Sequence, residues 1–340
     1  MLNLKARDAK VNFETLDAFK ELTKDLNMTK TASRLFISQQ TLSNQIIRLE
    51  KELGVQLFER KPKLKLTIAG QHVLDFAKTV SFDQRRLMEI LKEIEGENIG
   101  TISLGASTLR SSGCLPEILP KFSSAYPYVD FDLTNDTSNN LQRMLDEGEI
   151  DLAICVMDGQ IPRNLVAKHI LADQLYFCVS EKLLNKVYGE AVAEKLKLKS
   201  KNGAKVGDFS KLPYFVMKNQ NKLAFTISKC FTEAGYTPKV YLASMLTRIT
   251  VPICSAGLAA SIITKMNLKM NLDKLGNDVN VFPLLYQNKP IFHNLYLVHR
   301  RDKIITKYLS YFMKTLEEYF DELNNIDLTS VVSSRTDKNK

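Results

Sequence analysis

A short segment rich in side-chain amides and hydroxyls holds the residue types best suited to specific recognition. Its candidate members are Ser38, Gln39, Gln40, Thr41, Ser43, Asn44 and Arg48. An amide can pair with the edge of a base in two places, and a guanidinium suits a phosphate, so these residues are candidates for contact with DNA. The same pattern occurs in ordinary amphipathic surface helices, and by itself the segment leaves both interpretations open.

Helical periodicity predicts how this segment is held. Leu42, Ile46, Leu49 and Leu53 recur at helical spacing and predict one buried face, and Ser38 is a good N-cap. The polar residues would then face outward on the opposite side.

Two further helices are predicted before this segment. One carries an apolar stripe from Phe13 to Leu26, and the other runs from Thr29 to Phe36 with Ala32, Leu35 and Phe36 inward. This is helix-turn-helix organisation, in which a small residue such as Ala32 permits close crossing of helices.

A short two-stranded wing is predicted after Gly54, over residues 57–67. Its exposed edge carries Lys61, Lys63 and Lys65, which would contact phosphates or the adjacent minor groove. The whole pattern predicts a winged helix-turn-helix DNA-binding domain over residues 11–66.

This region resembles the LysR-type transcriptional regulators. The matching residues are the run from Ala32 through RLFISQQTLSNQIIRLEKELGVQLFER to Leu66-Thr67-Ile68-Ala69-Gly70. The family usually has proline where Gln40 stands, a basic residue where Asn44 stands, and Gly-Ser where Leu26-Asn27 stand. The resemblance implies double-stranded DNA as a partner and leaves the bound sequence open.

A long helix is predicted over residues 67–96. Along it, apolar residues interrupted by one glutamine repeat at spacings of four and three, a heptad seam typical of paired helices. The seam consists of Val73, Ala77, Val80, Gln84, Leu87, Leu91 and Ile94. Both the pattern and the resemblance predict dimerisation, as a homodimer or homotetramer. A helix packed on its own domain is the alternative.

From residue 100 strands alternate with helices, which predicts an α/β fold. The stretches LPEILPKFSSAYPYVDFDL and GEIDLAI resemble the effector domain of the same family. That resemblance implies a doubly wound, two-subdomain effector domain over residues 100–325. We assign residues 100–170 and 279–325 to subdomain I, residues 171–278 to subdomain II, and residues 326–340 to a polar tail. The lysine-rich residues 181–211 are expected to be a surface insertion.

Candidate effector-binding residues follow the predicted strands, because ligands of such sheets bind at the carboxyl ends of the strands. They are Ser107, Thr108, Asn135, Met157, Met217 and Lys218. By resemblance these positions line the cleft for a small-molecule effector. The alternative is that the hydroxyls and the amide are only caps and turns. Lys218 would favour an anionic effector if it faces the cleft, and would be a solvated surface lysine otherwise.

Composition and charge agree with a soluble protein that meets a polyanion. The 340 residues are 44% hydrophobic and 25% charged, with a net charge of +9. The first 78 residues hold fourteen Lys and Arg against nine Asp and Glu, which favours a polyanion at that end. There is no apolar run of membrane-spanning length and no signal-peptide core, so we expect a cytoplasmic protein without a membrane partner.

Other classes of function are disfavoured. Without a signal peptide, a transport receptor of the same fold would not be exported. Five cysteines without CxxC spacing and four scattered histidines predict neither a metal site nor a cofactor. An enzyme is not expected, because GxSxG, P-loop and dinucleotide-binding motifs are lacking. The remaining alternative is a thiol redox-sensing regulator, for which Cys114 is the candidate. We therefore expect a sequence-specific transcriptional regulator whose DNA binding is modulated by an effector.

Overall fold

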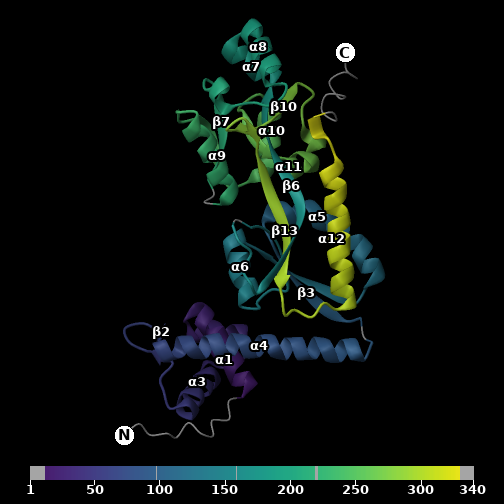
Figure 1. The fold of residues 1–340 in the computed structure, drawn as a ribbon. Coiled ribbons are helices and arrows are strands. Elements are labelled where there is room, and N and C mark those ends of the chain that lie inside the picture. Colours follow the sequence, from purple (N-terminus) through teal and green to yellow (C-terminus); the bar gives the residue numbers. More distant parts are fainter. Residues whose placement is uncertain (1–11, 97, 158, 219–220, 330–340) are drawn as a thin grey trace. The chain divides into compact units, whose positions relative to one another are not determined.

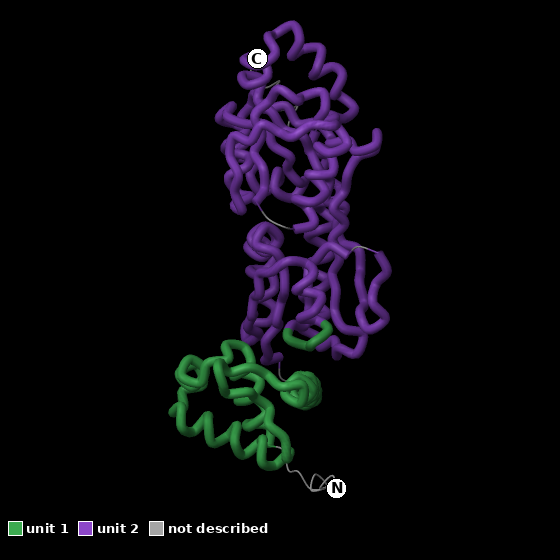
Figure 2. Tube along the Cα trace, turned by 90° about the vertical axis from the view of Figure 1, so that its left-hand side faces the viewer, with its two compact units in different colours: residues 1–97, 146–149 green, residues 98–145, 150–340 purple. Residues whose placement is uncertain are grey.

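The computed structural model describes residues 12–96, 98–157, 159–218 and 221–329. The chain divides into an N-terminal unit, residues 1–97 with 146–149, and a C-terminal unit, residues 98–145 with 150–340 (Figure 2). The predicted domain start at residue 11 and the predicted tail from residue 330 lie outside the described residues.

The N-terminal unit has the predicted winged helix-turn-helix fold, followed by a long helix (Figure 1). Its elements are α1 Phe13–Asp25, α2 Met28–Arg34, α3 Gln39–Leu53, β1 Phe58–Glu59, β2 Lys65–Leu66 and α4 Ile68–Ile94. Phe19, Leu22, Leu42, Ile46 and Leu49 have no exposed surface and form the centre of its core. Burial of these side chains fixes the orientation of α3 and turns its polar face outward.

Phe36 does not face inward as predicted. Helix α2 ends at Arg34, and Phe36 has a positive φ of 55°. Its side chain is 96% exposed, whereas Ala32 is buried. The prediction is wrong because the chain leaves the helix before Phe36, so helical periodicity no longer decides where that side chain points.

The predicted seam of α4 divides into two halves. Ala77 is fully buried, and Val73 and Val80 pack against the core of the same unit. The exposed members are Gln84, Leu87, Leu91 and Ile94. The prediction that Ala77 contacts a second chain is wrong, because its own domain covers it; the packed-helix alternative holds for the first half of the seam.

The C-terminal unit contains two sheets joined by strand β6, as the predicted α/β fold of two subdomains requires. The first sheet has the order β4-β3-β5-β13-β6, with β3 parallel to β4 and β5, and β13 antiparallel to β5 and β6. Its elements are β3 Gly100–Ala106, α5 Thr108–Ala125, β4 Val129–Asn135, α6 Ser138–Asp146, β5 Leu152–Val156, β6 Leu165–Ser180, β13 Phe292–Arg300 and α12 Lys307–Asn325. In the core of this subdomain, the rings of Phe122 on α5 and Phe312 on α12 pack edge to face, with their centroids 5.4 Å apart.

The second sheet is built on the end of β6. Strands β9 and β10 pair antiparallel with it, and β7, which is parallel to β8, is bridged through Tyr214 to Ala260, the residue before β9. The elements of this subdomain are α7 Glu181–Tyr188, α8 Glu190–Ser200, η2 Val206–Phe209, β7 Pro213–Met217, α9 Lys222–Glu233, β8 Lys239–Ser244, η3 Thr247–Ile249, α10 Thr250–Ser255, β9 Ser261–Thr264, α11 Lys265–Met270, η4 Leu272–Lys274, β10 Val279–Pro283, β11 Leu285–Tyr286 and β12 Lys289–Pro290. In Figure 1, β6 and β13 lie side by side where the two subdomains meet.

One predicted subdomain boundary is corrected by strand pairing. Val279–Pro283 pairs with Tyr176–Ser180, so it belongs to the second sheet and not, as predicted for residues from 279 onward, to subdomain I. The chain returns to the first sheet only with β13. An apolar strand has the same residue pattern in either sheet, so the pattern does not reveal its partner.

Two segments are more deeply packed than predicted. Residues 181–211 are not a mere surface insertion, because Leu183, Leu184 and Phe209 lie in the core of the second subdomain. The predicted polar tail begins with Ile326, which packs against a core cluster, and Leu328, which is fully buried. A single leucine among polar neighbours produces no periodic signal, so its burial was not predicted.

No helix in the described ranges is long and apolar enough to cross a membrane.

Candidate nucleic-acid interface and ligand cavities

Helix α3 presents two exposed amides one turn apart. Gln40 and Asn44 are both exposed, and positions i and i+4 of a helix lie on the same face. Neither side chain has a hydrogen-bonding or charged partner within the described part of the chain. Both amides are therefore available to an external partner.

The other predicted residues of α3 are engaged in local contacts. The backbone N–H of Thr41 donates to Ser38 Oγ at 3.0 Å, which caps the helix. The Gln39 amide oxygen accepts a hydrogen bond from a hydroxyl of α2 at 3.3 Å, and Arg48 donates to Glu52 at 2.9 Å. These contacts hold the helix in place, and they leave the exposed polar face open. Ser43 is partly buried at its edge.

Glu50 connects α3 to the wing. Its Oε1 accepts hydrogen bonds from the backbone N–H groups of Leu57 at 2.9 Å and Phe58 at 3.2 Å, and its Oε2 accepts one from Arg60 at 2.9 Å. Sequence reasoning missed this residue, because a glutamate beside the apolar stripe of a helix looks like any solvated residue. The wing lysines Lys61, Lys63 and Lys65 are all exposed, as predicted.

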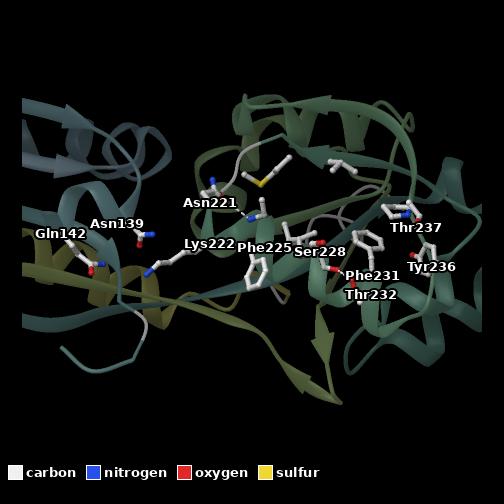
Figure 3. A pocket seen from close by; sticks show the side chains of 15 residues that line it. Asn139, Gln142, Asn221, Lys222, Phe225, Ser228, Phe231, Thr232, Tyr236 and Thr237 are labelled. Carbon is white, nitrogen blue, oxygen red and sulfur yellow. Dashed lines mark hydrogen bonds between the residues drawn. The ribbon is translucent and has the colours of Figure 1, made fainter. Parts of the chain in front are cut away.

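The larger cavity of the C-terminal unit lies along α9 and has a volume of about 890 Å³ (Figure 3). Helix α6 of the first subdomain contributes Asn139 and Gln142 to its wall. The second subdomain contributes Val216, Met217, Asn221, Lys222, Ala224, Phe225, Ile227, Ser228, Phe231, Thr232, Tyr236, Thr237 and Pro238. Polar groups therefore converge from both subdomains on a partly apolar space of the size that small ligands occupy.

A smaller cavity of about 260 Å³ shares Lys222 and Phe225 with the larger one. The rest of its wall consists of Val156, Met157, Thr226, Lys229, Phe292, His293 and Asn294. The His293 ring and the Thr226 hydroxyl lie 3.1 Å apart, across β13 and α9.

Lys222 links the two subdomains at these cavities. Its Nζ donates a hydrogen bond to the carbonyl oxygen of Val156 at 2.9 Å, and Gln142 donates to the same oxygen at 3.2 Å. In Figure 3 the Lys222 side chain extends from α9 toward Asn139 and Gln142. The first residue of α9 is thus in contact with the carboxyl end of β5.

Two family models match the chain. Residues 13–71 match the model of the bacterial regulatory helix-turn-helix protein, lysR family, and residues 95–321 match the LysR substrate binding domain. The chain belongs to the LysR family.

Several known members of the LysR family are similar to this chain. The HTH-type transcriptional activator IlvY of Haemophilus influenzae is 35% identical over 157 residues, 46% of this chain and 54% of that protein. The chain thus matches about half the length of the first curated relatives. The structure of full-length CbnR complexed with its target DNA has a TM-score of 0.57 at 20% identity, covering 91% and 99% of the two chains. A full-length variant of OxyR from Pseudomonas aeruginosa has a TM-score of 0.63 at 16% identity, covering 92% and 95%. At these identities the two structures show the same fold.

The predicted effector residues of this LysR-family chain are only partly brought together. Met217 lines the larger cavity and Met157 the smaller one. The residues that line neither cavity are Ser107, Thr108, Asn135 and Lys218. The Asn135 amide donates to the carbonyl of Ala106 at 3.1 Å and to Ser111 at 3.0 Å, which is the structural role of a turn. Lys218 is exposed.

Sequence reasoning missed Lys222, the cation that does line the cavities. The available signal was weak: Asn221 caps α9 by accepting a hydrogen bond from Ala224 N at 2.9 Å, and Lys222 is the next residue. A lysine in the first turn of a helix opposes the helix dipole, so a functional reason for it could have been considered.

A carboxyl group and a guanidinium that interact electrostatically are buried near the start of α5. Asp173 on β6 is buried, and its carboxylate accepts a hydrogen bond from Met266 N at 2.9 Å. Burial raises the pKa of Asp173 to about 6, although the nearby charge of Arg110 opposes that rise. Burial likewise lowers the pKa of Arg110, which donates to Ser107 Oγ at 3.3 Å. Ser107 is therefore in contact with a cation of its own domain.

The cysteines do not have the surroundings of redox sensors. All five thiols are buried. Burial raises the pKa of Cys114 to about 12 and that of Cys155 to about 11, so both are protonated thiols at neutral pH. No group of three or more potential metal ligands occurs among the described residues.

Proposed function

We propose that this chain is a sequence-specific DNA-binding regulator of transcription, with residues 11–66 as its DNA-binding domain. The observation that carries this proposal is the open face of α3, where Gln40 and Asn44 are exposed and without a partner in the described chain. A helix enters the major groove with its first turns, and an amide there can pair with adenine. The wing lysines would neutralise phosphates beside it.

The names of the matched family model and of similar proteins support this proposal. The matched N-terminal model is described as a regulatory helix-turn-helix protein, IlvY is named a transcriptional activator, and the CbnR structure contains that protein's target DNA. These relatives are named as regulators of transcription, and we assign this chain no catalytic activity and no cofactor.

We propose further that residues 100–325 bind a small-molecule effector that modulates DNA binding. The supporting observations are the two adjoining cavities and the hydrogen bond of Lys222 across the subdomains. A ligand bound between α6 and α9 would favour one arrangement of the two subdomains over others. The matched model for this region is described as a substrate binding domain.

The remaining parts of the proposal concern assembly and location. Residues 67–96 would join two or four copies through the exposed half of the α4 seam, where Leu87, Leu91 and Ile94 are open to solvent. The assembled protein would work in the cytoplasm, where it meets double-stranded DNA.

Selection of bound sequences from a random DNA pool tests the proposed function. We expect the full-length chain to enrich one sequence, and to bind it at least about 1,000-fold more tightly than random DNA at the same salt concentration. A chain that enriches no sequence, or that binds the selected and random DNA alike, would contradict the proposal.

A further inference from the structure

The chain that follows α12 joins the core of the first subdomain to a core of the second. Helix α12 packs in the first core through Leu309, Phe312, Leu316, Phe320 and Leu323. Beyond the helix, Ile326 packs against that core and also against a core cluster built on β6, β9, β10, α10 and α11. Leu328 is fully buried in this second cluster. In Figure 1, α12 runs along the first subdomain and its C-terminal end points toward the second.

Asn324 fixes the end of α12 to β6 at an irregular point of that strand. The register of β6 against β13 shifts at Ile170, which is an extra residue of β6. The Asn324 amide donates to the carbonyl oxygen of Ile170 at 2.9 Å and accepts a hydrogen bond from the backbone N–H of Ala172 at 3.1 Å. A bulge disrupts the hydrogen bonds of a strand locally, and here one side chain supplies partners. The contact lies just before β6 enters the second sheet at Leu175.

The second subdomain holds the same asparagine through a buried lysine. Lys265, the first residue of α11, is 6% exposed, and its Nζ donates to the backbone carbonyl oxygen of Asn324 at 2.8 Å. A cation at the carboxyl end of a helix interacts favourably with the helix dipole. Burial lowers the pKa of Lys265, and the charges of Asp173 and Asp327 oppose that change. Asn324 is therefore bound by β6 at its side chain and by α11 at its backbone.

A single side chain anchors the last of these contacts. Asp327 is exposed, whereas the next residue, Leu328, has no exposed surface. The backbone N–H of Thr329 donates to Asp327 Oδ1 at 3.0 Å, which shapes a turn around the leucine. Withdrawal of Leu328 would therefore expose one leucine and its pocket, a local opening that leaves both subdomains folded.

We propose that residues 324–328 form a clamp that fixes the orientation of the two subdomains relative to each other. Rotation of one subdomain against the other requires that Leu328 leave the second core and that Lys265 release Asn324. Once the clamp is released, the subdomains stay joined through β6 and the start of β13, and a strand with a bulge near the crossing can bend there. Because the clamp is made by the chain itself, it acts with or without a bound effector.

Distances between spin labels on the two subdomains test the clamp in the full chain. The labels are attached at Lys121→Cys on α5 and Lys195→Cys on α8, two exposed positions, whereas all five native thiols are buried. Labelled chains are mixed with an excess of unlabelled chains, so that an oligomer contains at most one labelled chain. With the clamp intact, we expect one narrow distribution of distances between the labels.

Two shortened chains separate the clamp from the residues that follow it. A chain that ends at Asn325 lacks Leu328, and we expect it to show a second distance or a broader distribution. A chain that ends at Thr329 keeps Leu328 and should retain the native distribution. Thermal unfolding of both chains shows whether they are folded.

Point variants make the same test without shortening the chain. Leu328→Ala should raise the ratio of released to clamped molecules at least about tenfold, because the leucine contacts are lost only from the clamped state. Lys265→Met removes the bond to Asn324 and should also produce the second distance. The matched control is Leu316→Ala, which removes the same atoms from a fully buried leucine in the first core. It should lower the thermal midpoint and leave the distances unchanged.

A folded chain ending at Asn325 with the native distribution would overturn the clamp, because β6 and β13 would then fix the orientation by themselves. If that chain does not fold, native distances in both Leu328→Ala and Lys265→Met would overturn it equally. A second distance in Leu316→Ala, or in the chain ending at Thr329, would assign the change to general loosening or to later residues, and would also contradict the proposal.

Discussion

At the scale of single residues, Leu26 has a backbone conformation that suits glycine. It ends α1 with φ 49° and ψ 36°, in the left-handed region. We expect Leu26→Gly to raise the free energy of unfolding of the N-terminal unit by about 0.5–1 kcal/mol, because glycine relieves the clash of Cβ with the backbone. Chemical denaturation measures this change in the free energy of unfolding.

Leu26→Ala is the matched control, since alanine removes most of the side chain and keeps Cβ. It should produce no gain in stability. If glycine destabilises the unit as much as alanine does, the contacts of the leucine side chain outweigh the backbone strain.

Individual residues were predictable from the sequence where a regular element continues around them. Leu42, Ile46 and Leu49 are buried at the predicted spacing. Phe36 lies one residue beyond the C-cap of α2, and Leu328 lies beyond the end of α12, so the periodicity of neither helix applied to them. Lys222 could not be assigned to a cavity, because the other wall comes from α6, about eighty residues earlier in the chain.

At the scale of elements, the wing depends on Glu50. The variant Glu50→Ala leaves the backbone N–H groups of Leu57 and Phe58 without their partner. We expect it to lower the free energy of unfolding of the N-terminal unit by about 1–3 kcal/mol. Hydrogen exchange at these two amides should become faster.

The control for Glu50 is Glu52→Ala, on the same helix. Glu52 pairs only with the exposed Arg48 among the hydrogen bonds described, so its loss should cost less than about 1 kcal/mol. Equal effects of the two substitutions would show that Glu50 has no special role in holding the wing.

Strand β6 carries a buried carboxyl group that makes stability depend on pH. The pKa of Asp173 is raised from 3.8 to about 6 by burial, so folding favours its protonated form. Its protonation stabilises the folded protein below pH 4, and this contribution is lost as the pH rises through 6. We expect the stability of Asp173→Asn relative to the native chain to grow by about 2 kcal/mol between pH 4 and pH 7.

Thermal midpoints of both proteins across this range measure the effect. Asp130→Asn, at an exposed position of β4, is the control and should show no such trend. A difference between Asp173→Asn and the native chain that is independent of pH would contradict the assignment.

The positions of helices and strands were predicted better than the pairing and packing between them. The buried run at β5 and the alternation at β4 both form strands of the first sheet. The pairing of β10 with β6 was not predicted, because pairing is decided by contacts between segments about one hundred residues apart. The packing of α7 and α8 was missed for the same reason.

At the scale of the whole molecule, self-association should depend on the second half of α4. Leu87 is 53% exposed in the single chain, so Leu87→Glu should leave the fold intact. In a paired seam the same carboxylate would be buried, and we expect the dissociation constant of the dimer to rise at least about tenfold. Sedimentation equilibrium measures this change.

Thr79→Glu is the control for the seam, because Thr79 is exposed on α4 and is not a seam residue. It should not change the dissociation constant. An unchanged association of Leu87→Glu would place the contact between copies elsewhere.

The most direct test of sequence-specific DNA binding is the affinity of Asn44→Ala for the selected sequence and for random DNA, at one salt concentration. We expect Asn44→Ala to weaken binding to the selected sequence by about 1–3 kcal/mol and to leave binding to random DNA unchanged. Changing the single base pair that Asn44 reads should abolish the difference between the variant and the native chain. Lys63→Ala should instead weaken binding to both DNAs and lower the salt slope by about one unit. Equal losses of Asn44→Ala on the two DNAs would contradict base reading by α3.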